Sequence, residues 1–330
     1  MMDVNRRQAR YSPADQSIAN RVRRKLQYSI YRQKWNIAAT PYSVSVVAGL
    51  EGRRKQQKAL DDLRWMDERR DFFAADPFII RKPGTASEYL IFYEHLSWRT
   101  NRGRIDCVDF KDGQFGAVRV CLESPYHLSY PHVLLDEGQI AILPEHSASK
   151  DLSIYRVNER GVADKKTTIG RHLDLVDSTL LFDGDRHWLF CTHAGAADKS
   201  ELHIYHAETV FGPWRPHERN PVKTDLFDAR PAGAFIRHGG ELFRPAQDCR
   251  SHYGAGVVVN RVTRLTESEF VEEQVSEVRP KPGSRYDYGL HTISSAGEYT
   301  AIDGARIESS IHPRLDRFGH LFRPRPRAAA

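Results

Sequence analysis

From residue 71 onward, short apolar runs alternate with turns rich in glycine and aspartate, a pattern typical of an all-β protein. Within this pattern one unit recurs along the chain. It consists of a polar or otherwise distinctive anchor residue, a short apolar strand, a turn, a strand of aromatic and apolar residues, and a polar end. The unit occurs at residues 76–94, 130–145, 177–193, 230–248 and 290–303.

The spacing of these units favours a β-propeller. Their anchors lie about 50 residues apart, which is the repeat length of one propeller blade. Five units predict five blades, with candidate outer strands between them. The fifth unit has little strand sequence after it, so we expect the β-branched segment 35–48 to complete that blade and close the ring. The predicted architecture is one five-bladed propeller over residues 35–310, followed by a tail, 311–330, that we expect to be disordered.

The segment before the propeller has a helical periodicity. In residues 13–34, Ile18, Val22, Leu26 and Ile30 recur at a spacing of four, and the other faces are rich in arginine. We therefore predict an α-helical appendage over residues 1–34. Two interpretations of it stay open: a helix that packs on the protein and exposes its charges, or a basic helix that docks on an anionic membrane surface or a partner protein.

Composition and charge narrow the possible functions. The net charge is +6, but the basic excess lies in residues 1–70 and the remainder is close to neutral, which argues against a nucleic-acid groove across the fold. The four cysteines form no CxxC pair, which indicates a reducing compartment. No signal peptide and no apolar run of membrane-spanning length is visible. We expect a cytoplasmic protein, peripheral to the membrane if the basic helix docks there.

The first strand of each propeller blade lines the central axis, so the anchors are candidate site residues. They are Asp76, Tyr130, Asp177, Arg230 and His291. Asp76 and Asp177 stand out, because two carboxylates held across a pocket are the working groups of glycoside hydrolysis. The alternative is that each aspartate only caps a turn.

Further polar residues extend this candidate site. Arg230 and Arg244 could recognise an anionic substituent of a ligand, although Arg230 could equally form a structural ion pair with Asp177. The ends of the second strands add Glu145, Gln247 and Asp248. No histidine pair has metal-ligand spacing and no phosphate-binding glycine loop is present, so we predict no metal and no cofactor. The loop and anchor aromatics that could stack on a sugar are Trp98, Tyr126, Tyr130, Tyr253, Tyr286 and Tyr288.

Several long motifs at these positions carry a resemblance to a known family. They are ADPFII (75–80), SYPHVLL (129–135), VDSTLLFDGDRHWLF (176–190), DARPAGAF (228–235), LFRPAQDC (242–249) and GLHTIS (289–294). Together they resemble the N-terminal domain of glucosamine inositolphosphorylceramide transferases and its bacterial relatives. That domain is in turn similar to the five-bladed propellers of the furanosidase superfamily, which includes glycoside hydrolase family 43.

The resemblance implies roles for the anchors. Asp76 resembles the catalytic base or nucleophile of those hydrolases, Asp177 the aspartate that tunes its pKa, and His291 their axial histidine. The hydrolases place a general-acid glutamate where this chain has Arg230, so the acid would have to come from Glu145 or, less directly, from Glu94.

Two functions follow from this resemblance. One is a glycoside hydrolase or transglycosidase that acts on a furanoside or an anionic glycan. The alternative is a non-catalytic module that binds a glycan or glycosyl-phosphate as the accessory of a glycosyltransferase, docked through residues 13–34.

Overall fold

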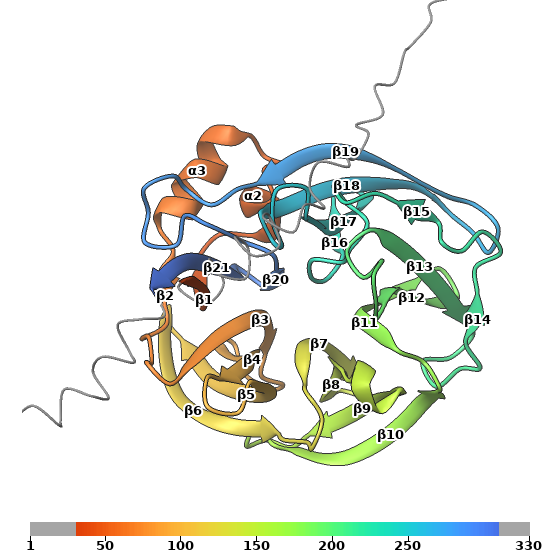
Figure 1. Ribbon diagram of the computed structural model, residues 1–330, viewed down its shortest axis with the longest axis horizontal. Coiled ribbons are helices and arrows are strands. Elements are labelled where there is room, and N and C mark those ends of the chain that lie inside the picture. The colour runs from red at the N-terminus through yellow and green to blue at the C-terminus, as the bar shows by residue number, and fades with distance from the viewer. Residues whose placement is uncertain (1–30, 310–330) are drawn as a thin grey trace, which may run out of the picture. The chain divides into compact units, whose positions relative to one another are not determined.

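The computed structural model describes residues 31–309. Contacts within the chain separate a body, Trp35–Arg306, from a second unit, of which residues 31–34 and 307–309 are described. The body is mostly β structure. Its five antiparallel sheets surround a central axis, and each forms one blade of a five-bladed propeller (Figure 1). The predicted fold class is confirmed.

Each of the first three blades comes from one continuous stretch of chain. Blade 1 consists of β3 (Phe72–Arg81), β4 (Glu88–Ser97), β5 (Arg102–Lys111) and β6 (Gln114–Leu122). Blade 2 consists of β7 (Ser129–Asp136), β8 (Gln139–Glu145), β9 (Asp151–Val157) and β10 (Ala163–Arg171), with the 3₁₀ turn η2 (Ser147–Ser149) after β8. Blade 3 consists of β11 (Leu175–Asp183), β12 (Arg186–His193) and β13 (Glu201–Ala207), with β14 (Arg215–Pro216) and β15 (Lys223–Thr224) both paired to β13.

The last two blades differ in how the chain supplies them. Blade 4 is continuous and consists of β16 (Ile236–His238), β17 (Glu241–Asp248), β18 (Gly256–Leu265) and β19 (Phe270–Val278). Blade 5 joins distant parts of the chain, in the sheet order β20 (Ile293–Ala296), β21 (Tyr299–Ser309), β1 (Tyr31–Thr40) and β2 (Arg64–Trp65). The early strand β1 therefore lies in the last blade and closes the ring.

The structure corrects two boundaries near the start of the body. The strand expected over 35–48 ends at Thr40, and the short helices α2 (Val44–Val47) and α3 (Arg53–Asp61) follow. The valines of α2 resemble those of a strand in the sequence, but here they belong to a helix that packs into the core, where Val46 and Val47 are buried. Residues 31–34, expected to end a helix, belong to β1. The rest of the helix predicted over 13–34 and the tail 311–330 lie outside the described residues.

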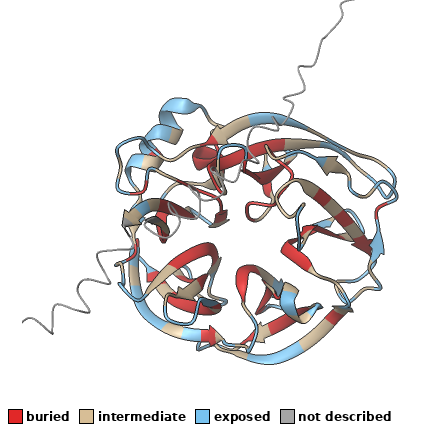
Figure 2. Ribbon diagram, in the orientation of Figure 1, coloured by how far each residue is buried: buried red, intermediate tan, exposed pale blue. Residues whose placement is uncertain are grey.

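Hydrophobic clusters hold the ring together at each seam between neighbouring blades. Successive clusters join blades 5 and 1, 1 and 2, 2 and 3, 3 and 4, and 4 and 5. Buried segments accordingly lie in every blade, while the outer strands are more exposed (Figure 2). Because each blade buries its apolar side chains against the next, the blades position one another around the axis.

Within residues 31–309, no helix combines the length and the apolar character needed to cross a membrane.

Candidate functional site

Three of the anchors share one unusual backbone geometry. Asp76, Tyr130 and Asp177 each interrupt the register between the first and second strands of their blade. Each also has a positive φ, of 52°, 42° and 51° respectively. Non-glycine residues seldom adopt this left-handed conformation, and a β-bulge redirects the side chain that it carries. The repeat seen in the sequence thus corresponds to a repeated bulge.

Asp76 is buried at the axis and is held by donors from two other blades. Its Oδ2 accepts a hydrogen bond from the Tyr130 backbone N–H (3.2 Å), and its Oδ1 accepts one from the Thr292 hydroxyl (2.9 Å). Burial raises the pKa of Asp76 to about 6; His291 opposes this shift, and the negative charges of Asp177 and Asp303 add to it. This carboxylate is therefore fixed in orientation and titrates close to neutral pH.

Asp177 is paired with Arg230, as one of the two sequence interpretations proposed. The Arg230 Nε donates to Asp177 Oδ2 at 2.6 Å, and the Gln247 side-chain N–H donates to the same oxygen at 3.0 Å. Burial raises the pKa of Asp177 to about 6, against the opposing effect of Arg230. Arg230 also donates to the backbone carbonyl of Asp198 (3.1 Å) and lies 3.4 Å from its carboxylate. Arg230 thus faces two carboxylates within the protein, and its recognition of an anionic substituent stays a prediction.

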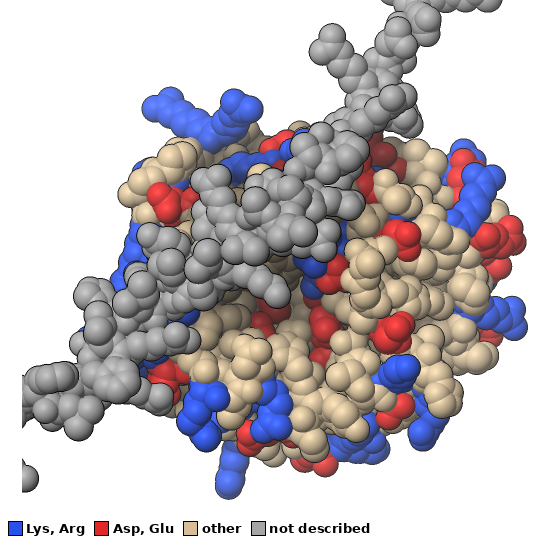
Figure 3. Space-filling model, in the orientation of Figure 1, with Lys and Arg blue, Asp and Glu red and all other residues tan. Residues whose placement is uncertain are grey.

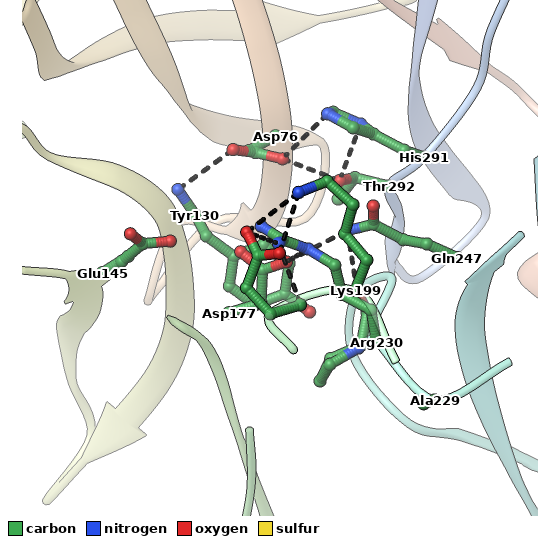
Figure 4. Close-up of polar contacts among 12 residues, drawn as sticks. Asp76, Tyr130, Glu145, Asp177, Lys199, Ala229, Arg230, Gln247, His291 and Thr292 are labelled. Carbon is green, nitrogen blue, oxygen red and sulfur yellow. Dashed lines mark hydrogen bonds and ion pairs between the residues drawn. The ribbon is translucent and has the colours of Figure 1, made fainter. Parts of the chain in front are cut away.

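The second strands contribute to the same site, because an antiparallel partner ends beside the start of the first strand. Glu145 ends β8 opposite Ser129 and turns its carboxyl group toward the space between Asp76 and Asp177 (Figure 4). Burial raises its pKa, and Ser147 donates to its Oε1 at 3.1 Å. Glu94 lies within β4, opposite Ala75 of β3; burial raises its pKa too, and it lies 3.2 Å from the His127 ring.

His291 forms a buried ion pair with Asp303, which lies within β21. Its Nδ1 lies 2.5 Å from Asp303 Oδ2, its Nε2 lies 3.7 Å from Asp76 Oδ1, and its ring stacks on Trp35 with centroids 4.0 Å apart. Burial disfavours the charged imidazolium, but Asp303 and Asp76 outweigh it and raise the pKa of His291 to about 9. At neutral pH the ring is therefore protonated.

Asp76, His291 and Asp303 are also the group of described residues whose ligand atoms, all within 4.8 Å, could surround a metal ion. Asp303 has little capacity left for one. Its carboxylate already accepts from the backbone N–H groups of Asp76, His291 and Thr292 and from the His291 ring. These four donors match the four lone-pair sites of a carboxylate, so hydrogen bonding accounts for the cluster.

Three residues predicted to bind ligand are bonded to other groups of the protein. Tyr130 is fully buried, and its hydroxyl bonds to Thr179 (2.8 Å) and accepts from the Gly233 N–H (2.6 Å), which ties blades 2, 3 and 4 together. Arg244 pairs with Glu272 through two hydrogen bonds of 2.8 and 2.6 Å and donates to the carbonyls of Asp228 and Ala229. Asp248 pairs with Arg250 and Arg279. Their polar groups are occupied within the protein.

Other residues join the site beyond the predicted set. Thr292 and Asp198 contact the anchors directly, as described above. In the sequence, only its position next to His291 pointed to Thr292 as a site residue, and nothing pointed to Asp198. Tyr253, a loop aromatic named from the sequence, lies with its ring 5.1 Å from the Arg230 guanidinium and 5.2 Å from the His291 ring. The Lys199 ammonium lies 6.0 Å from the same ring.

The site as a whole is rich in hydrogen-bond acceptors. The space-filling view shows a hollow at the centre of the ring with acidic side chains on its walls (Figure 3). Asp76, Glu145 and Asp177 face this space. The Gln247 Oε1 is buried and, among the described residues, has no hydrogen-bond partner. Carboxylates accept hydrogen bonds, so the three that face the hollow favour a ligand that donates them.

The ion pair of His291 predicts a pH dependence of stability. Its pKa is raised from 6.5 to about 9, so the stabilisation is complete below pH 6.5 and is lost as the pH rises toward 9. Urea unfolding across this range should show the decline. The His291→Gln variant should be less stable at pH 6.5 and should show a smaller decline; an equal decline in both proteins would contradict the assignment.

The architecture is that of the five-bladed propellers found in glycoside hydrolases. The structure is similar to an α-L-arabinofuranosidase from Podospora anserina determined in complex with cellotriose, with 10% identity and a TM-score of 0.54 over 70% of this chain and 80% of that one. It is also similar to a thermostable family-43 glycoside hydrolase, with 14% identity and a TM-score of 0.50 over 68% and 85%. At these identities the likeness establishes the fold alone.

Sequence similarity identifies the family, which the likeness in fold does not. The family model described as Glucosamine inositolphosphorylceramide transferase 1, N-terminal, matches residues 67–286, and the chain belongs to this family. The Glucosamine inositolphosphorylceramide transferase 1 of Oryza sativa subsp. japonica is 29% identical over 265 residues, which cover 76% of this chain and 35% of the rice protein. The chain thus spans about a third of the length of that relative.

Proposed function

We propose that the axial site binds a glycan without cleaving it, and that the chain serves as a recognition module for a glycosyltransferase. The observation that carries the proposal is the pairing of Arg230 with Asp177, at the anchor where the resembling hydrolases place their general acid. The family membership supports a link to glycosyl transfer. Docking of the module through residues 13–34 remains part of the proposal.

The chemistry of the site favours an amino sugar as the ligand. Asp76, Glu145 and Asp177 place three carboxyl groups around the hollow (Figure 4). An ammonium group supplies both positive charge and hydrogen-bond donors, whereas a phosphate supplies neither. The glucosamine in the relatives' name gives a natural probe.

Saturation-transfer NMR at neutral pH would test this with glucosamine, glucose and myo-inositol 1-phosphate. We expect glucosamine to bind roughly tenfold more tightly than glucose, because its ammonium forms charge-assisted hydrogen bonds with the carboxylates. The phosphate should bind least. Asp76→Asn should remove most of the preference for glucosamine. Asp183→Asn, which changes an exposed carboxylate on β11, is the matched control and should leave the preference unchanged. Equal binding of glucosamine and glucose would contradict the amino-sugar assignment, and no binding of either would contradict the module.

A second candidate function, glycoside hydrolysis, is favoured by Glu145. Its carboxyl group faces Asp76 and Asp177, and burial raises its pKa, as a general acid requires. The same protein would be incubated with 4-nitrophenyl α-L-arabinofuranoside and 4-nitrophenyl β-galactoside. If the protein turns over either substrate, and both Glu145→Gln and Asp76→Asn abolish this activity, the protein is a hydrolase and not a binding module. The proposed binding module predicts no turnover.

A further inference from the structure

A second cavity lies on the flank of the propeller, away from the axis, where blade 5 meets blade 1. Its volume is about 570 Å³, within the range of small-molecule binding sites. It is lined by β2 of blade 5, by the connection from β2 to β3, and by β3, β4, β5 and β6 of blade 1. The axial anchors Asp76 and Asp177 are not among the lining residues.

The cavity exists because the two facing blades differ in width at their outer edges. Blade 5 ends in β2, which has only two residues, whereas blade 1 ends in β6, which has nine. The inner part of this seam is filled by the hydrophobic cluster around Ile91 and Val108. The outer part of blade 1 is left uncovered, and Val118 of β6 is 50% exposed there.

The lining combines aromatic rings with a paired set of polar groups. Trp65, Phe72 and Phe115 contribute partly exposed rings. Arg104 donates to both oxygens of Asp106, at 2.8 and 3.3 Å, so their charges compensate each other.

Charge over the whole cavity is balanced as well. Its lining contains Arg64, Arg69 and Arg104 and equally Asp67, Asp71 and Asp106. This balance does not favour an ionic ligand.

One polar group in the cavity wall is left without a partner. Tyr93 is buried, and its hydroxyl has no hydrogen-bond partner among residues 31–309. A buried hydroxyl without a partner is unfavourable, so a ligand hydroxyl or a bridging water at this point would be stabilising.

We propose that this cavity is a second carbohydrate site, which binds an uncharged sugar. A sugar ring has apolar faces that pack on aromatic side chains, and its hydroxyls both donate and accept hydrogen bonds. It therefore matches the aromatic rings, the Arg104–Asp106 pair and the Tyr93 hydroxyl together. An apolar ligand would leave the Tyr93 hydroxyl unsatisfied, and a phosphate would meet as many aspartates as arginines. The proposal does not depend on what the axial site binds.

Two substitutions test the site without disturbing the fold. Tyr93→Phe removes the unpartnered hydroxyl alone, so stability should not fall while sugar affinity falls roughly five- to tenfold. Val118→Arg places a long side chain in the cavity from an exposed position and should abolish binding there. Val120→Arg, on the same strand and 39% exposed but outside the cavity lining, is the matched control and should bind normally.

The measurement is saturation-transfer NMR of the full chain with glucose, galactose, mannose and N-acetylglucosamine, and the part of the signal that Val118→Arg removes and Val120→Arg keeps is assigned to the flank cavity. The site is supported if at least one sugar gives a signal, if Val118→Arg removes that signal and if Tyr93→Phe weakens it. Equal signals in Val118→Arg and Val120→Arg for all four sugars overturn the proposal, and so does the absence of any signal.

Discussion

Replacing Gly233 with alanine is expected to lower the free energy of unfolding by roughly 3–5 kcal/mol, because the new side chain both clashes and strains the backbone. Gly233 has a φ of 121°, and a Cβ at this position would lie 1.8 Å from the Ile293 carbonyl oxygen. It bridges blade 4 to β20 of blade 5, and its N–H donates to the Tyr130 hydroxyl. Only a residue without a side chain allows this close approach.

Urea unfolding of both proteins measures the effect, with Gly184→Ala as the control. Gly184 also has a positive φ, of 68°, but no atom lies within 4 Å of the Cβ that alanine would add. Gly184→Ala should lower the free energy of unfolding by only roughly 1–2 kcal/mol, the cost of the left-handed backbone alone. Equal losses at the two glycines would show that the contact between blades 4 and 5 at Gly233 is not a tight constraint.

Arg230→Met is expected to destabilise the protein by roughly 3–5 kcal/mol at neutral pH, because it leaves a buried carboxylate without its cation. Of its side-chain partners within residues 31–309, Asp177 would keep the hydrogen bond from Gln247 alone, while Glu145 repels it. The pKa of Asp177, already raised to about 6, should rise further. A raised carboxyl pKa destabilises the ionised form, so the penalty is present above the folded-state pKa and is relieved as the pH falls through it.

The difference between wild type and Arg230→Met in urea unfolding should therefore be smaller at about pH 4 than at about pH 7.5. Arg237→Met is the matched control, since Arg237 pairs with Asp183 in solvent, where the two side chains are 57% and 41% exposed. Exposed pairs contribute less than about 1 kcal/mol, so this control should change little at either pH. A pH-independent loss for Arg230→Met would argue that the lost packing of the arginine, and not the charge of Asp177, causes the effect.

The sequence was sufficient to predict the repeat and its anchors. Each blade is a series of adjacent antiparallel strands, so its alternation of apolar and polar residues and its turns are local signals. Asp76, Tyr130 and Asp177 were recognised as equivalent, and the structure gives all three the same bulged, positive-φ backbone. The segment 41–48 was misread because α2 is as apolar as a strand when it packs into the core.

Side-chain partnerships were harder to predict. Tyr130 and Arg244 have residue types suited to ligand contact, yet their polar groups are bonded to Thr179, Gly233 and Glu272 within the protein. Thr292 and Asp198 carried little or no sequence signal, although both contact the anchors. Such pairs join residues far apart in the chain, so no periodicity reveals them.

The number of blades, the identity of the anchors and the family could all be read from the chain, because they depend on local hairpins and motifs. The charge state of the site could not. Asp177 and Arg230 are 53 residues apart in sequence but 2.6 Å apart in space, and His291 meets Asp303 across its own blade at 2.5 Å. Electrostatic interaction depends on distance and burial, and the packing of the blades around the axis sets both.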